Sequence, residues 1–238
     1  MNTTSMTERI REAPRPKARI AGLIYLLNFL TGVVAVPGFK LVVSGNATAT
    51  AANILAHQLL FRLGFAALLL NVAIYVVVTA LFYDLFKPVD RSLSLLAAFF
   101  SLVGCAVQAL ACLFYLAPVV VLGGGQYLSV FKVEQLRALA LMFFELYGQA
   151  YNIGLVFFGF YCLLIGYLVF RSTFMPRILG VMMALAGLAW LTFMLPPLAN
   201  YLIPYNLAVG ALMELSLTLW LLAMGVKVER WRESGASV

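Results

Sequence analysis

The sequence predicts an all-α, polytopic integral membrane protein, built as a bundle of six transmembrane helices. Of its 238 residues, 64% are hydrophobic, only 11% are charged, and the mean hydropathy is +1.00. A soluble domain is roughly 45–50% apolar and about 25% charged. Six apolar stretches each reach the ~20 residues that a helix needs to cross a hydrocarbon core about 30 Å thick. None shows the alternating polarity of a transmembrane β-strand.

The six predicted spans share length and apolar composition; in chain order they are Ile20–Val43, Leu59–Phe86, Leu93–Leu122, Leu146–Phe170, Ile178–Leu195 and Tyr205–Val226. They must be helices, because a backbone in lipid has to satisfy its own hydrogen bonds. The first apolar run exceeds a signal-peptide core of roughly 7–15 residues, so we expect it to remain uncleaved. The spans form one domain, residues 20–226, between tails 1–19 and 227–238.

The connections predict further elements. Thr48–His57 has helix-forming composition but is too polar to span, which predicts a short surface helix. Lys132–Glu145 is expected to extend the fourth span outward. Pro196–Pro204 closes the last outer hairpin, and Pro204 suits the first turn of the sixth helix.

Charge predicts the orientation. Twelve of the 16 Lys and Arg residues flank one set of span ends, and four flank the other set. Cytoplasmic flanks are the positive ones. We therefore expect a multi-pass protein of the cytoplasmic (inner) membrane with both termini in the cytoplasm.

The basic N-terminal cluster has two readings, nucleic acid or lipid. Arg9, Arg11, Arg15, Lys17 and Arg19 have no aromatic residues among them, and the first apolar run begins where they end. This pattern is typical of a topology signal with affinity for anionic headgroups. We expect membrane lipids as partners and no nucleic acid.

Four segments carry a family resemblance: ARIAGLIYLLNFLTG, ATAANILAHQLLFRLGF, KPVDRSLSLLAAFF and YNIGLVFFGFYCLLIGYLVFRSTFMPRILGVMMALAG. Their order resembles the bacterial membrane-protein family called domain of unknown function 4386. Phe170–Gly180 is the most specific part, and the resemblance covers Ala18 to about Leu195. It implies a multi-span fold and brings no activity with it.

Metal and cofactor chemistry find few ligands here. The three cysteines lie inside predicted spans, and His57 is the one histidine. Zinc and di-iron sites need several converging histidines or carboxylates, and no hydrolase or P-loop motif is present. We expect no metal, no cofactor and no catalytic residue.

Glu214 is the clearest candidate for a functional group. It follows Pro204 by ten residues, which places it ~15 Å into a helix, near the middle of the membrane. An ionised group there costs at least ~2.5–3.5 kcal/mol on insertion scales. The carboxyl either senses a proton or cation or anchors a polar ligand group, or it is protonated and links neighbouring helices.

Arg62 and Glu145 lie near the outer starts of the second and fourth spans. Their similar depth predicts an ion pair. Binding of an anion or substrate is the alternative, and Arg62 can also reach lipid headgroups, as arginines near helix ends do.

Neutral polar residues gather in the outer half of the predicted bundle: Asn71, Gln108, Gln149, Tyr151 and Asn152. Glu145, Gln149 and Asn152 share one helical face, which we expect to point inward because polar side chains avoid lipid. The set predicts a polar cavity that opens outward and narrows towards Glu214. Hydrogen bonds between helices, without a cavity, are the alternative.

Small residues at regular spacing predict close helix contacts. In the fourth and fifth spans they are Gly154, Gly159, Gly166, Gly180, Ala184 and Gly187.

Three functions fit these residues. The first is binding or transport of a small, partly apolar ligand, contacted by Glu214, Arg62, Glu145, Gln149, Asn152, Gln108 and Asn71. The second is a membrane enzyme that acts on a lipid or isoprenoid with Glu214 as acid or base. The third is a structural or regulatory subunit without a ligand. Homo-oligomerisation is compatible with all three.

Overall fold

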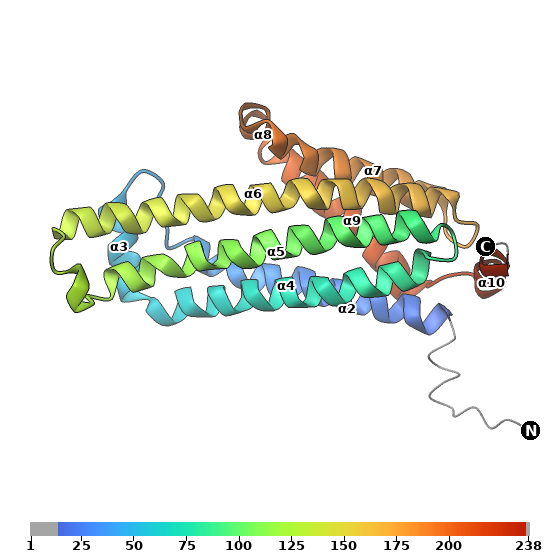
Figure 1. The fold of residues 1–238 in the computed structure, drawn as a ribbon, viewed down its shortest axis with the longest axis horizontal. Coiled ribbons are helices and arrows are strands. Elements are labelled where there is room, and N and C mark those ends of the chain that lie inside the picture. Colours follow the sequence, from blue (N-terminus) through green and yellow to red (C-terminus); the bar gives the residue numbers. More distant parts are fainter. Residues whose placement is uncertain (1–13, 237–238) are drawn as a thin grey trace, which may run out of the picture. The chain divides into compact units, whose positions relative to one another are not determined.

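The computed structural model describes residues 14–236, with side chains to Ser234. Arg9 and Arg11 of the predicted basic tail lie outside the described residues. All regular structure in this range is helical (Figure 1): α2 (Pro14–Phe39), α3 (Ala47–Ala56), α4 (Gln58–Phe86), α5 (Arg91–Leu122), η1 (Gln126–Leu128), α6 (Val133–Arg171), α7 (Arg177–Leu191), η2 (Thr192–Met194), α8 (Pro196–Leu202), α9 (Tyr205–Ala223) and α10 (Val228–Ala236).

Six of these described segments are long and apolar enough to cross a membrane: α2, α4, α5, α6, α7 with η2, and α9. They coincide with the six predicted spans, so the chain is an all-α, polytopic membrane protein. The boundaries differ at the first span, which is already helical at Pro14, the first described residue, rather than from Ile20. The helix therefore includes part of the basic flank.

The connecting segments also form helices. The predicted surface helix is present as α3, whose Asn46 side chain accepts a hydrogen bond from the Ala49 amide at 2.9 Å. The extension of the fourth span is helical from Val133 onward. Two short α-helices were not foreseen, α8 within the last hairpin and α10 in the C-terminal tail, and neither was the short 3-10 helix η1.

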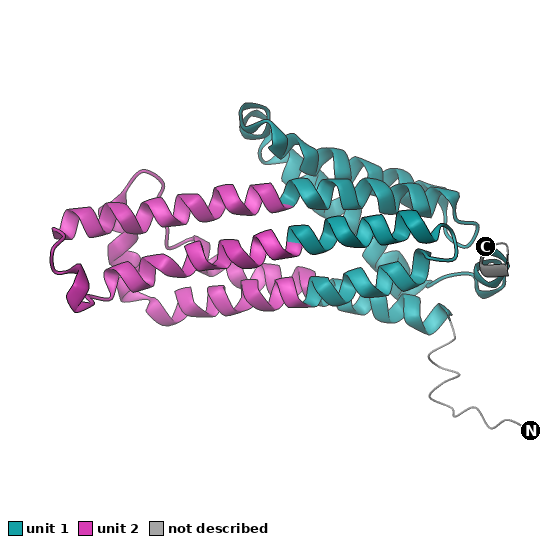
Figure 2. Cartoon of the chain, viewed as in Figure 1, with its two compact units in different colours: residues 1–27, 74–104, 155–238 teal, residues 28–73, 105–154 magenta. Residues whose placement is uncertain are grey.

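The chain divides into two compact units (Figure 2). Unit 1 comprises residues 1–27, 74–104 and 155–238, as far as the structure describes them, and unit 2 comprises residues 28–73 and 105–154. Helices α2, α4, α5 and α6 contribute residues to both.

The core of unit 2 is aromatic. The Tyr115 ring stacks on Phe61 with centroids 4.4 Å apart, and it meets Phe39 and Tyr147 edge-on. Gly38 and Gly64 leave room for the Tyr115 hydroxyl, because a Cβ atom at Gly64 would lie 2.5 Å from that oxygen. The hydroxyl is buried and has no hydrogen-bond partner among the described residues.

In unit 1, α6 and α7 touch through glycines. A Cβ atom at Gly166 would lie 2.7 Å from the carbonyl oxygen of Gly180, and one at Gly187 would lie 2.7 Å from that of Gly159. Both pairs bring backbone against backbone, so side chains at these positions would force the helices apart. The predicted close packing of these two spans is confirmed.

Candidate functional site: a buried carboxyl in unit 1

Glu214 lies on the buried face of α9. Its side chain is 6% exposed, and the residues buried beside it, Gly210, Leu217 and Leu221, recur at helical spacing. Thr218 completes this face and donates its hydroxyl to the Glu214 carbonyl at 2.9 Å. The polar side chain therefore belongs to the interior of unit 1.

Three neighbouring helices supply hydrogen-bond donors to the carboxyl. From α7, Trp190 Nε1 donates to Oε1 at 2.5 Å. From α6, Cys162 Sγ donates to the same oxygen at 3.6 Å. From α2, the Tyr25 hydroxyl bonds Oε2, and the Tyr75 hydroxyl of α4 lies 3.3 Å from that of Tyr25.

Glycines place two of these donors. A Cβ atom at Gly210 would lie 2.3 Å from Trp190 Cζ2, so only glycine admits the indole beside α9, one turn before Glu214. A Cβ atom at Gly22 would lie 2.5 Å from the backbone nitrogen of Leu222. This close approach of α2 to α9 brings Tyr25, one turn further on, to the carboxyl.

Aromatic rings surround the carboxyl and its donors. Tyr25 meets the rings of Tyr75 and Phe82 edge-on, each with centroids 5.6 Å apart. Tyr75 in turn packs on Phe158, with centroids 4.6 Å apart. Among the described residues no Lys, Arg or His forms an ion pair with Glu214. A buried carboxylate without a cation carries its full desolvation cost, offset only by neutral donors.

The hydrogen bonds can close with the proton on or off the carboxyl, because a tyrosine hydroxyl both donates and accepts. With Glu214 ionised, Tyr25 donates to it and accepts from Tyr75. With Glu214 protonated, the carboxyl donates to Tyr25, which donates to Tyr75. Trp190 donates to Oε1 in both states. Each of these oxygens can therefore keep a hydrogen bond whether the carboxyl gains or loses the proton.

The other six predicted site residues all belong to unit 2. The predicted ion pair between Arg62 and Glu145 is wrong: both side chains are exposed, and they do not approach within 4 Å of each other. Exposed ion pairs contribute little free energy, so similar depth is insufficient to bring the two side chains together.

The predicted inward face of Glu145, Gln149 and Asn152 is also wrong. Glu145 and Gln149 are exposed, and Asn152 is half-buried. The buried face of this part of α6 instead carries Tyr147, which packs among aromatic rings. Large apolar rings stabilise the interior more than amides do, and they occupy the inward positions.

Gln108 is buried, as expected for a polar residue within a span, whereas Asn71 is half-buried. The side-chain amide of Asn71 donates to the backbone carbonyl of Asn28 at 2.6 Å. In return, the side-chain amide of Asn28 donates to the backbone carbonyl of Asn71 at 2.8 Å. The Asn71 amide also lies 3.0 Å from the Thr31 hydroxyl. These bonds join α2 to α4, which is the role predicted by the alternative without a cavity.

Sequence reasoning missed the donors Tyr25, Tyr75, Cys162 and Trp190. One signal pointed to three of them: Tyr and Trp concentrate at membrane interfaces, whereas Tyr25, Tyr75 and Trp190 fall inside predicted spans. Of the described residues, no group of three or more His, Cys, Asp or Glu could hold a metal ion.

The chain is similar to one protein family and to a protein of known sequence. The family described as "Domain of unknown function (DUF4386)" matches residues 20–225. A protein of Archaeoglobus fulgidus, described as "Uncharacterized protein", is 25% identical over 116 residues, covering 49% of this chain and 56% of the relative. The chain thus spans little more than half the length of that relative. No solved structure matches.

Proposed function

This chain belongs to the DUF4386 family, and we propose that it is a membrane protein that binds or transports a small, partly apolar ligand, with Glu214 balancing positive charge. That charge is either a proton or a cationic group of the ligand. The observation that carries the proposal is a buried carboxyl that has neutral donors and no cation beside it among the described residues.

The surroundings of Glu214 support this chemistry. Tyrosine and phenylalanine rings attract cations through their faces, and a carboxylate adds a full negative charge. An intramembrane carboxyl is also a recurrent part of proton relays. The chain Glu214–Tyr25–Tyr75 provides a path of hydroxyls along which a proton can be exchanged.

Location and orientation are part of the same proposal. We place the protein in the cytoplasmic membrane with both termini in the cytoplasm, because twelve of the 16 basic residues flank those span ends. The N-terminus of α7, the C-terminus of α9 and α10 then face the cytoplasm.

A structural or regulatory subunit is the second candidate. It is favoured by one observation: Glu214 is 6% exposed and its oxygens already have partners within the protein. In this reading the carboxyl links α2, α6, α7 and α9, and it neither titrates nor contacts a ligand.

Two measurements on Glu214→Gln separate the candidates. Native mass spectrometry of detergent-purified protein, with its organic extract, should reveal a stoichiometric small molecule that the variant loses. Infrared difference spectroscopy across a pH titration should reveal a protonated carboxyl C=O band that the variant lacks. The matched control is Glu134→Gln, which neutralises an exposed carboxylate at the start of α6 and should keep both signals.

Either signal, lost in Glu214→Gln and kept in Glu134→Gln, supports the proposal. If the wild-type protein carries only bulk phospholipid and shows no titrating carboxyl that depends on Glu214, the proposal fails. The structural reading then stands.

A further inference from the structure

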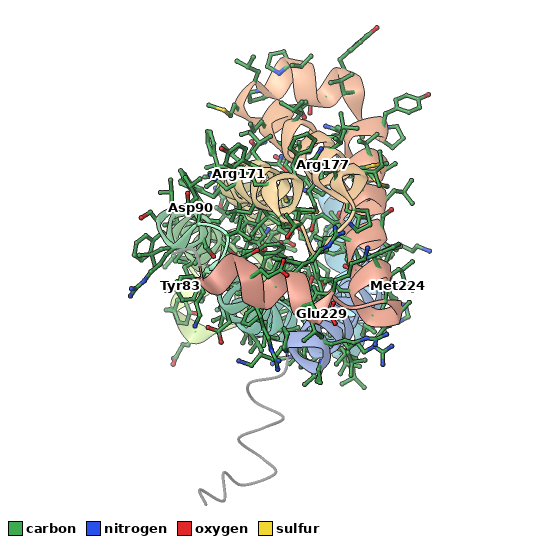
Figure 3. All side chains as sticks on the ribbon, turned by 90° about the vertical axis from the view of Figure 1, so that its right-hand side faces the viewer. Tyr83, Asp90, Arg171, Arg177, Met224 and Glu229 are labelled. Atoms are coloured by element: carbon green, nitrogen blue, oxygen red, sulfur yellow. The ribbon has the colours of Figure 1, made fainter. Side chains whose placement is uncertain are left out.

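A cavity opens at one end of unit 1, between the start of α7 and the end of α9. Its volume is about 1170 Å³, and α10 forms part of its wall. Figure 3 looks onto this end of unit 1, with Arg177 above α10 and Met224 to the right of it. Its lining contains neither Glu214 and its hydrogen-bond partners nor any site residue that we predicted from the sequence.

Hydrogen bonds to backbone carbonyl groups hold α10 in place. Gly225 has φ +65°, where an L side chain is strained, and this turn directs the chain away from α9. The Lys227 amide then donates to the Phe174 carbonyl at 3.3 Å. Arg230 donates to the Thr173 carbonyl at 3.2 Å, and Trp231 Nε1 donates to the Leu85 carbonyl at 2.9 Å. These bonds fix α10 against α4 and against the segment that precedes α7.

The lining is strongly cationic. It contains four basic side chains and one carboxylate: Arg15, Arg177, Lys227, Arg230 and Glu229. All five are exposed. Among the described residues no carboxylate forms an ion pair with any of the four cations. Four basic side chains against one carboxylate give the cavity a net positive charge, which attracts anions.

The start of α7 borders the same cavity through Pro176 and Arg177. Pro176 is the N-cap of the helix and gives no side-chain cap. The Leu179 amide donates to the Pro176 carbonyl at 3.1 Å. The positive end of the helix dipole favours an anion here, and Arg177 at the first position of α7 adds a full positive charge.

Apolar side chains complete the lining. Phe174, Met175 and Val226 are buried, and Trp220 is half-buried. A site with guanidinium and ammonium groups on apolar walls suits a molecule with a phosphate and an apolar part. Arginine forks match phosphate oxygens in pairs, and lysine binds them as a point charge.

We propose that this cavity binds a phosphate-bearing anion, presented either by a lipid headgroup or by a soluble phosphate ester. Arg177, at the start of α7, and Lys227, after the end of α9, contact the phosphate. Arg15 and Arg230 complete the positive field. The proposal is independent of Glu214 and goes beyond the function proposed above.

The test uses the full-length protein and two probes. Phosphatidylglycerol in nanodiscs and in native mass spectrometry supplies a lipid headgroup, and glycerol 3-phosphate in calorimetry supplies a soluble ester. In Arg177→Gln/Lys227→Gln, binding of the effective probe should weaken at least about tenfold, the order expected for loss of hydrogen bonds to charged groups. Arg232→Gln removes an exposed cation of α10 that does not line the cavity, and it should bind as the wild type does.

Each outcome decides the matter. Phosphatidylglycerol binding alone, lost in the double variant, identifies a lipid site, and binding of both probes identifies a site for the phosphate itself. Failure of both probes overturns the proposal. So does weakening that is equal in Arg232→Gln, which would show a general charge effect. An unchanged melting temperature of the double variant verifies that it is folded.

Discussion

The glycine contact between α6 and α7 predicts that one added Cβ atom lowers the stability of the protein. In Gly166→Ala, the new Cβ atom would lie 2.7 Å from the carbonyl oxygen of Gly180 and 2.8 Å from the backbone nitrogen of Ala184. Both neighbours are backbone atoms, so no side chain can rotate away. The helices must separate, and the contacts along their interface weaken.

The expected size follows from two opposing effects. Overpacking a close-packed interior costs typically about 1–3 kcal/mol. Replacing glycine by alanine within a helix returns about 0.8–1 kcal/mol. The net loss of unfolding free energy is about 0–2 kcal/mol and centres near 1 kcal/mol, which for a protein of this length lowers Tm by up to roughly 8 °C. Thermal unfolding in detergent, followed by loss of the monodisperse peak in size-exclusion chromatography, measures this shift.

Gly148→Ala is the matched control, because it makes the same substitution in the same helix. A Cβ atom at Gly148 would meet nothing within 4 Å, so only the gain in helix propensity remains. Its Tm should rise by roughly 2–4 °C. If Gly166→Ala melts at or above Gly148→Ala, the α6–α7 approach does not limit stability and the reasoning is refuted.

Further variants test other contacts by the same melting assay. Tyr115→Phe should raise stability by about 1 kcal/mol, because it removes a buried hydroxyl that has no hydrogen-bond partner among the described residues; a lower Tm would contradict this. Gly64→Ala should destabilise, and Tyr115→Phe in the same chain should restore Tm, since the hydroxyl is the atom that the new Cβ meets first. Gly210→Val should destabilise and shift tryptophan fluorescence, because its Cβ overlaps the Trp190 ring; unchanged emission would argue against that packing. Glu214→Leu should cost about 1–3 kcal/mol by stranding the Trp190 donor, whereas Glu214→Gln, which keeps an accepting oxygen, should melt near the wild type.

Sequence predicted the fold well for a physical reason. A bilayer imposes both a length and an apolar composition on each span, and both can be counted along the chain. The α6–α7 contact was predictable too, since only small residues allow such an approach. Helix α10 escaped prediction because nine polar-rich residues, Val228–Ala236, carry no span signal, and its contacts come from α4 and from the segment before α7.

The site was predictable only as far as single residues go. Glu214 could be identified because a carboxyl within a span is expensive wherever it points. Its partners could not, because Tyr25, Cys162 and Trp190 come from three other helices, and their arrangement depends on helix order. The direction of the face Glu145–Gln149–Asn152 was predicted wrongly. Spacing shows that residues share a face, but the side chains that pack best, such as Tyr147, decide which face points inward.

The buried carboxyl of Glu214 and the cationic cavity both involve α7 and α9. Their separation along these helices decides whether the two sites can interact. Trp190 lies thirteen residues after Arg177 on α7, and Met224 lies ten residues after Glu214, so the two sites are ~15–20 Å apart along the helices. A phosphate in the cavity is too far from Glu214 for a direct contact. Phosphate binding should therefore be the same in Glu214→Gln as in the wild type. An altered affinity would require α7 and α9 to move as a linked pair, with the Trp190 indole against Gly210 as the contact that transmits the change.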